Sequence, residues 1–146
     1  MTVAIERTPD GRRLVVARTV DAPAETVWSI LTDTARWPEW GPSVAAVDCP
    51  ERFIQSGSRG YIETVGPGTF LGPDRSGLRV PFRITTCADY RWTWRVAGVP
   101  ATGHRVESRG ENCRVAFEIP LPAAAYAPVC RRALVAIGRI VRDATG

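Results

Sequence analysis

The segment 15–44 places a strand, a helix and an aromatic turn in one order. Residues 15–20 show the two-residue period of a strand. Pro23 then suits the first position of a helix, where a missing N–H costs nothing, and Glu25 places a carboxylate at the positive end of the helix dipole. The segment 36–42, RWPEWGP, is too rich in Pro and Gly for a long helix, and its two indoles need packing partners. Apolar residues at helical spacing support the helix: Val27, Ile30 and Leu31.

Short β-forming segments separated by turn residues occupy the middle of the chain. Tight connections of this kind join neighbouring antiparallel strands. We therefore predict a seven-stranded antiparallel sheet. Its first strand is 15–20, and the others are 43–49, 59–65, 80–87, 90–96, 101–108 and 113–120.

A long helix is predicted to close the chain. Pro120 and Pro122 end the last strand, and apolar residues then recur at helical spacing over about 123–142, a length of roughly 30 Å. Pro128 either kinks this helix or marks its true start. The apolar face of the helix comprises Val129, Ala133, Leu134, Ile137, Ile140 and Val141.

Alternation along the strands gives the sheet one apolar, aromatic face. Trp92 and Trp94 share that face of their strand, and the same test adds Phe82 and Phe117. We expect this face to pack against the C-terminal helix. Because a filled core and a ligand cavity use the same apolar residues, the sequence leaves both open.

Two motifs carry a resemblance to a known superfamily. The first is Ala22-Pro23, Glu25, Val27-Trp28, Leu31, Asp33, Trp37, Trp40 and Pro42, and the second is YRWTWR at 90–95 followed by GHRVE at 103–107. On these residues the chain resembles the START/birch-pollen-allergen-like (SRPBCC) superfamily, and within it the polyketide cyclase/dehydrase-like branch, over roughly residues 12–144.

This resemblance implies an α+β helix-grip fold, in which the sheet wraps around the long C-terminal helix and short helices follow the first strand. The chain length of 146 residues fits one domain over 1–146. Members of the superfamily bind lipids, sterols, polyketides or plant hormones, and only some catalyse a reaction.

His104 is the only histidine in the sequence. By alternation it lies with Thr102 and Val106 opposite Arg105 and Glu107, on the expected concave side. There an imidazole hydrogen-bonds within the protein, contacts a ligand carbonyl or transfers a proton near neutral pH. Because no second catalytic group has a fixed place beside it, the structural interpretation comes first.

Tyr61 and Glu63 lie on a predicted strand without a clear apolar face, so that if Tyr61 points inward, Glu63 does too. A carboxylate in an apolar pocket would have a raised pKa and could act as a general base, or it would need an arginine partner. The alternative is an exposed Glu63, since glutamate is rarely fully buried. The candidate catalytic residues are therefore His104, Glu63 and Tyr61.

The superfamily places its ligand on the concave face, which implies that Trp92 and Trp94 line a pocket. Trp28, Trp37 and Trp40 favour core and lid packing over substrate stacking. Phe70 belongs to a long loop that is either a solvated connection or a gate over the pocket. The candidate ligand-binding residues are Trp92, Trp94, Phe82, His104, Phe117, Tyr61, Trp40 and Phe70.

Composition argues against other classes of partner. All 19 basic residues are arginine and are spread along the chain without a dense run, which disfavours nucleic acid binding. The four cysteines are scattered, which favours free thiols and disfavours a zinc site. The glycines of the long loop are spaced G-x-G-x-x-x-G, which is not a dinucleotide-binding motif, so we expect no cofactor.

No run approaches the ~20 apolar residues of a membrane span, and the N-terminus lacks the apolar stretch of a signal peptide, so we expect a cytoplasmic location. Two function classes remain. An apolar concave face suffices for a carrier or sensor of a small hydrophobic, lipid- or polyketide-like molecule. A polyketide cyclase or aromatase-like enzyme, acting on an aromatic or poly-carbonyl substrate, also needs polar groups aimed into the cavity. A filled core would instead favour an interaction role. Ligand identity and oligomeric state stay open.

Overall fold

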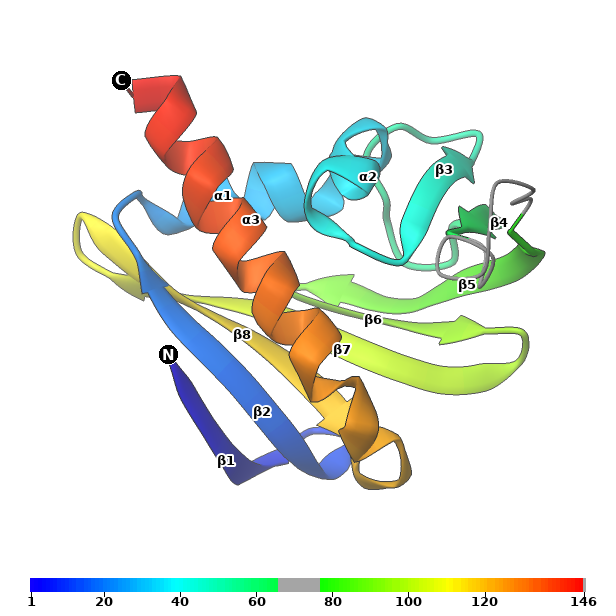
Figure 1. Cartoon of the computed structure of the whole chain (residues 1–146), viewed down its shortest axis with the longest axis horizontal. Coiled ribbons are helices and arrows are strands. Elements are labelled where there is room, and N and C mark those ends of the chain that lie inside the picture. Colours follow the sequence, from blue (N-terminus) through cyan, green and yellow to red (C-terminus); the bar gives the residue numbers. More distant parts are fainter. Residues whose placement is uncertain (66–76, 146) are drawn as a thin grey trace, which may run out of the picture.

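The computed structural model describes residues 1–65 and 77–145 of the chain. In this part, eight strands form one antiparallel sheet in the spatial order β1-β2-β8-β7-β6-β5-β4-β3 (Figure 1). The strands are β1 Thr2–Thr8, β2 Gly11–Val20, β3 Val44–Asp48, β4 Arg59–Thr64, β5 Arg79–Ala88, β6 Arg91–Val96, β7 Val99–Arg109 and β8 Asn112–Pro120. The helical elements are α1 Ala24–Thr32, η1 Thr34–Arg36, α2 Trp37–Trp40, η3 Leu121–Tyr126 and α3 Ala127–Thr145.

The α+β helix-grip fold is confirmed, but the expected number of seven strands is wrong by the edge strand β1. This strand pairs with β2 through a tight turn, in which the Thr8 hydroxyl donates to the Gly11 carbonyl at 2.7 Å. Most of its side chains are exposed, including Ile5, which is 58% exposed. Because no buried partner imposes an apolar face on β1, its sequence carries little of the pattern that marks a half-buried strand.

The C-terminal helix begins later than the sequence indicated. Residues 121–126 form a 3-10 helix with non-helical dihedral angles at Ala123, and α3 begins at Ala127. Pro128 therefore marks the start of the helix, one of the two alternatives open at the sequence level. Its missing N–H falls among the first-turn groups that have no intrahelical partner, whereas a helix from 123 would have lost a hydrogen bond there.

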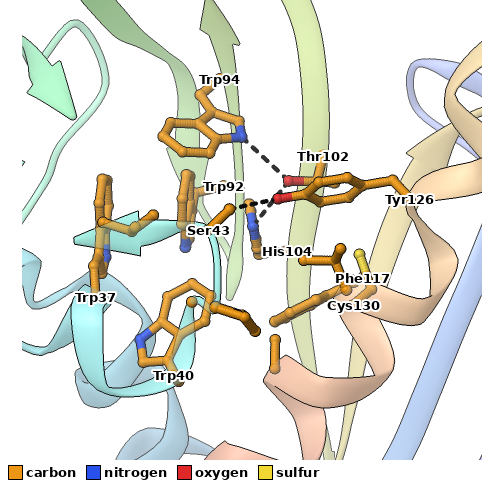
Figure 2. A pocket seen from close by; sticks show the side chains of 15 residues that line it. Trp37, Trp40, Ser43, Trp92, Trp94, Thr102, His104, Phe117, Tyr126 and Cys130 are labelled. Atoms are coloured by element: carbon orange, nitrogen blue, oxygen red, sulfur yellow. Dashed lines mark hydrogen bonds between the residues drawn. The ribbon is translucent and has the colours of Figure 1, made fainter. Parts of the chain in front are cut away.

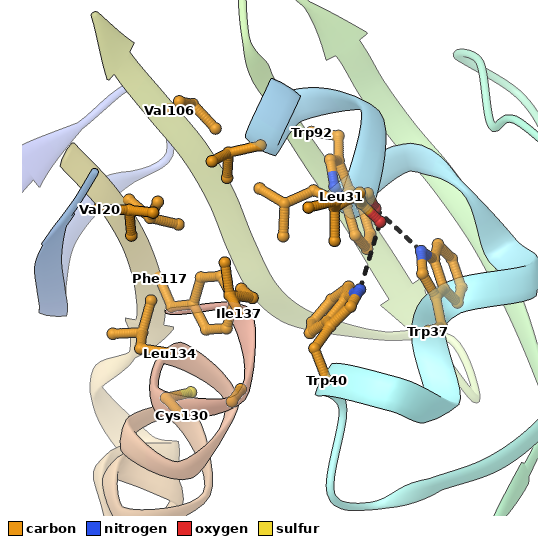
Figure 3. Packing of buried hydrophobic residues seen from close by; sticks show 14 of the residues in the cluster. Val20, Leu31, Trp37, Trp40, Trp92, Val106, Phe117, Cys130, Leu134 and Ile137 are labelled. Carbon is orange, nitrogen blue, oxygen red and sulfur yellow. Dashed lines mark hydrogen bonds between the residues drawn. The ribbon is translucent and has the colours of Figure 1, made fainter. Parts of the chain in front are cut away.

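The core lies between the inner face of the sheet and the helices. In Figure 1, α3 crosses this face, while α1 packs on β7 and β8. One large cluster of buried residues joins these layers, and it includes Val16, Leu31, Phe117, Leu134 and Ile137 (Figure 3). The face of α3 that this cluster buries is the one that the 3.6-residue period predicted.

The outer face of the sheet carries charged residues, and one of them is buried. Glu118 on β8 is 1% exposed, and its two oxygens accept hydrogen bonds from Arg91 and Arg105 at 2.7 Å each. These arginines lie directly opposite each other on β6 and β7. Gly103 makes room for the carboxylate, because a Cβ there would lie 2.8 Å from Glu118 Oε1.

Candidate functional site

A small cavity of about 40 Å³ lies inside the fold between the sheet, α2 and α3 (Figure 2). Since a water needs roughly 10–15 Å³ of such space, the cavity has room for only a few water-sized groups. The residues that line it are Trp37, Trp40, Gly41, Pro42, Ser43, Val44, Trp92, Trp94, Thr102, His104, Phe117, Tyr126, Val129, Cys130 and Ala133.

Stacked aromatic rings occupy most of the interior beside this cavity. The rings of Trp37 and Trp92 are parallel within 4° at a centroid distance of 5.2 Å. The indole N–H of Trp37 donates to the Leu31 carbonyl at 2.9 Å, and that of Trp40 donates to the Ile30 carbonyl at 3.3 Å (Figure 3). The end of α1 therefore fixes both indoles, and the aromatic turn that follows it is part of the core.

A chain of three side chains runs along the cavity wall. The Trp94 indole N–H donates to Thr102 Oγ1 at 3.2 Å, and Thr102 Oγ1 lies 3.2 Å from His104 Nε2 (Figure 2). The indole can only donate, whereas the threonine hydroxyl can donate to His104 Nε2 or accept from it, according to the tautomer of the ring. Nδ1 is buried, and no described atom meets the geometric criteria for a hydrogen bond with it, while the Trp92 backbone nearby partly opposes the lowering of the pKa of the ring.

His104 is neutral at physiological pH. It is 3% exposed, and burial lowers its pKa to about 3, with a further contribution from the positive charge of Arg91. A base with so low a pKa captures protons poorly near pH 7. The ring is therefore poorly suited to proton transfer.

A larger apolar groove of about 380 Å³ adjoins the cavity. Its volume falls in the range of small-molecule sites. Both spaces share five lining residues: Ser43, Val44, Trp94, Thr102 and Tyr126. The rest of the groove is lined by Ile62, Thr64, Val96, Val99, Pro100, Ala101, Ile119, Pro120 and Ala123.

Ser43 and Tyr126 form a hydrogen bond where the cavity and the groove meet. Their hydroxyl oxygens are 2.7 Å apart, and they join the segment after α2 to the end of η3 (Figure 2). We refer to this pair as the Ser43–Tyr126 latch. The sequence analysis missed it, since the two residues are 83 positions apart and no local pattern links them.

Five of the candidate residues line the cavity, namely Trp40, Trp92, Trp94, His104 and Phe117. Whether they bind a ligand stays a prediction. Phe82 instead packs against Trp37 in the core, at a centroid distance of 5.5 Å, and it lines neither the cavity nor the groove. Phe70 lies outside the described residues.

Of the two orientations that the sequence left open for Tyr61 and Glu63, the structure shows the outward one, so neither candidate reaches the cavity. Both are on the outer face of β4, where Tyr61 is 43% exposed and lies under the guanidinium of Arg79 at 4.3 Å. The inward positions of this strand include Ile62 and Gly60, whose missing side chain leaves room for Phe82. Because one inward residue is a glycine, the alternation showed no apolar face.

The described lining residues include no carboxylate and no arginine. The Cys130 thiol at the cavity is protonated, because burial raises its pKa to about 12. In residues 1–65 and 77–145, no cluster of histidine, cysteine and carboxylate side chains suits a metal ion. None of the helices described is long and apolar enough to cross a membrane.

Comparisons with known proteins agree with this architecture. The structure is similar to Ms6760 from Mycobacterium smegmatis, with a TM-score of 0.65 and 14% identity over 98% of this chain and 99% of the other. It is also similar to a protein from Arthrobacter aurescens, with a TM-score of 0.66 and 14% identity over 96% and 91%. CalU16 from Micromonospora echinospora has a TM-score of 0.59 and 18% identity over 97% and 82%.

No curated protein matches the sequence. At these identities the solved structures show the fold alone. The family model described as polyketide cyclase/dehydrase and lipid transport, in contrast, matches residues 12–142, nearly the whole chain. The chain therefore belongs to the polyketide cyclase/dehydrase and lipid transport family.

Proposed function

We propose that the protein is a carrier or sensor that binds a small hydrophobic, lipid- or polyketide-like molecule in the apolar groove, with one end of the ligand at the cavity. The observation that carries this proposal is that the two spaces share part of their lining, including Trp94, Thr102 and Tyr126. The groove supplies the volume for the apolar part of the ligand, and burial of that part drives binding. Thr102 and His104 supply hydrogen bonds to a polar end.

The chemistry of the lining favours binding over catalysis. An acid or base works best with a pKa near the operating pH, and the pKa of His104 is held near 3 while that of Cys130 is raised to about 12. No described group at the cavity titrates near neutrality. A cyclase remains the second candidate, because the Trp94–Thr102–His104 chain offers hydrogen bonds that could orient a carbonyl. The expected cytoplasmic location and single-domain organisation stay predictions.

Calorimetric titration with 2-naphthol, a flat polycyclic phenol, tests the groove. We expect one saturable site per chain. Ala123→Trp fills the groove and should weaken the affinity at least about tenfold, while Ala125→Trp, an exposed change on the same 3-10 helix that lines neither space, should leave it unchanged. Absence of saturable binding, or equal affinity in both variants, would contradict the proposal.

A further inference from the structure

Three arginines are aligned across the outer face of the sheet, which is the face opposite the apolar groove. Arg59 on β4 lies directly opposite Arg83 on β5, which lies directly opposite Arg95 on β6. All three are exposed. Since neighbouring strands are about 4.8 Å apart, the row spans only about 10 Å. Like charges directly opposite each other destabilise a sheet, so this register costs stability unless an anion offsets it.

No carboxylate among the described residues lies within 4 Å of these three guanidiniums. Arg95 donates to the Gly98 carbonyl at 2.9 Å, which fixes its position and leaves its other N–H groups available. In contrast, Arg79 on the same face of β5 pairs with Asp48 at 2.9 Å. On this strand, Arg83 therefore lacks the carboxylate partner that Arg79 has.

The same sheet face shows how an oxyanion satisfies such an arrangement. Arg91 and Arg105 are also direct cross-strand neighbours, and the buried Glu118 bridges them with one oxygen to each guanidinium. A carboxylate has two oxygens and one charge, and it matches two arginines. Three arginines match a group with three terminal oxygens and about two negative charges, which describes a phosphate monoester.

We propose that Arg59, Arg83 and Arg95 form a binding site for the phosphate group of a small phosphate monoester. The guanidinium forks of neighbouring strands present parallel N–H groups that suit bidentate phosphate contacts. This site lies on the sheet face opposite the groove, since Phe82, Trp94 and Val96 alternate with the arginines and pack in the core. It is independent of the proposed carrier function and can fail or succeed without it.

Titration with phenyl phosphate at fixed ionic strength, followed by amide NMR, tests the site. We expect saturable shifts centred on β4, β5 and β6, with benzoate, which has the same ring with a carboxylate, binding more weakly. Arg83→Gln should weaken phenyl phosphate binding at least about tenfold, the loss expected for one charge-assisted hydrogen bond. Arg131→Gln on α3 removes the same charge elsewhere and should leave binding unchanged. Shifts centred on α3, equal loss in both variants, or benzoate binding as tightly as the phosphate would overturn the proposal.

A charge-reversed variant gives a readout that does not depend on a ligand. Arg83→Glu places a carboxylate between Arg59 and Arg95, where it can pair with two arginines as Glu118 pairs with Arg91 and Arg105. It should raise the Tm above that of the parent protein while abolishing phenyl phosphate binding. A lowered Tm, or retained binding, would overturn the proposal. Vesicles with and without phosphatidic acid separate the sources of phosphate, because binding to phosphatidic acid vesicles without binding of phenyl phosphate would assign the row to a membrane surface instead.

Discussion

The imidazole of His104 stacks on the indole of Trp92, with ring centroids 3.8 Å apart and 16° between the planes. The two residues are direct cross-strand partners on β7 and β6. An indole face also attracts cations, so the stack alone would tolerate a charged imidazole. Desolvation decides the outcome, because the ring is almost fully buried and its pKa is lowered to about 3.

This burial makes stability depend on pH. In the unfolded chain a histidine titrates near 6.5, whereas folded His104 stays neutral down to about pH 3. Between these values the unfolded state binds more protons, so stability is complete above pH 6.5 and falls as the pH drops. We expect the free energy of unfolding to be about 1.5 kcal/mol lower at pH 5 than at pH 6.5.

Urea unfolding of the parent protein and of His104→Asn at both pH values checks this. The variant lacks the titrating ring and should show a much smaller decrease. Carboxylates contribute little in this window, and hydrogen bonds from Arg52 hold the pKa of the buried Asp33 below its ordinary value. An equal decrease in both proteins would rule out His104 as the source.

The buried Glu118 is expected to be a major contributor to stability. Glu118→Gln leaves two partly buried guanidiniums without their central carboxylate, although Arg91 keeps Asp10 and Arg105 keeps Glu6. We expect a loss of about 3 kcal/mol in urea unfolding, at the low end for breaking a buried ion pair. Glu39→Gln removes the carboxylate of the exposed Arg36–Glu39 pair and should cost less than about 1 kcal/mol. Similar losses of unfolding free energy in the two variants would contradict the prediction that the buried carboxylate contributes more to stability than the exposed one.

Opening of the Ser43–Tyr126 latch is expected to control ligand access to the cavity. Tyr126→Phe keeps the ring in the groove lining but removes the hydroxyl that is 2.7 Å from Ser43. Stopped-flow measurement of 2-naphthol binding should show a faster association rate, because one hydrogen bond worth about 1 kcal/mol no longer has to break. Ser43→Ala removes the same bond from the other side and should behave alike. Unchanged association rates in both variants would show that the latch does not control ligand access to the cavity.

Replacement of His104 distinguishes a carrier from an enzyme. In a carrier, His104→Ala removes at most one neutral hydrogen bond to the ligand and should weaken affinity by about 0.5–1.5 kcal/mol. In a cyclase that relies on this ring, turnover of a poly-carbonyl substrate should fall by about a hundredfold or more. Parallel binding and turnover assays on the two proteins provide the measurement, and we expect the carrier result because the ring is a weak base.

The sequence predicted the fold where strands have one buried face. Trp92 and Trp94 alternate with Thr93 and Arg95, and the corresponding strand was placed to within a residue. The same logic failed where burial does not impose a pattern, as on the exposed strand β1, and where an inward position is held by Gly60. A glycine there is required by the backbone carbonyl of Asp48 on the neighbouring strand and by the Phe82 ring, and no local signal reveals such contacts between strands.

The candidate site was predictable only in part for a related reason. Strand alternation placed His104 on the inner face, because that depends on local geometry. Whether the space beside it is open depends on ring orientations, such as the parallel packing of Trp37 on Trp92, that bring together segments distant in sequence. The latch between Ser43 and Tyr126 is of the same kind.

The small volume of the inner cavity has a consequence for selectivity. A molecule seated in the groove can project only a group of a few non-hydrogen atoms past Thr102, because stacked indoles close the space beyond. Within a homologous series, affinity should rise with each added methylene until the terminal group reaches this wall and then stop rising. The aromatic cluster would thus act as a molecular ruler for the end of the ligand, with its scale set by the position of Trp92.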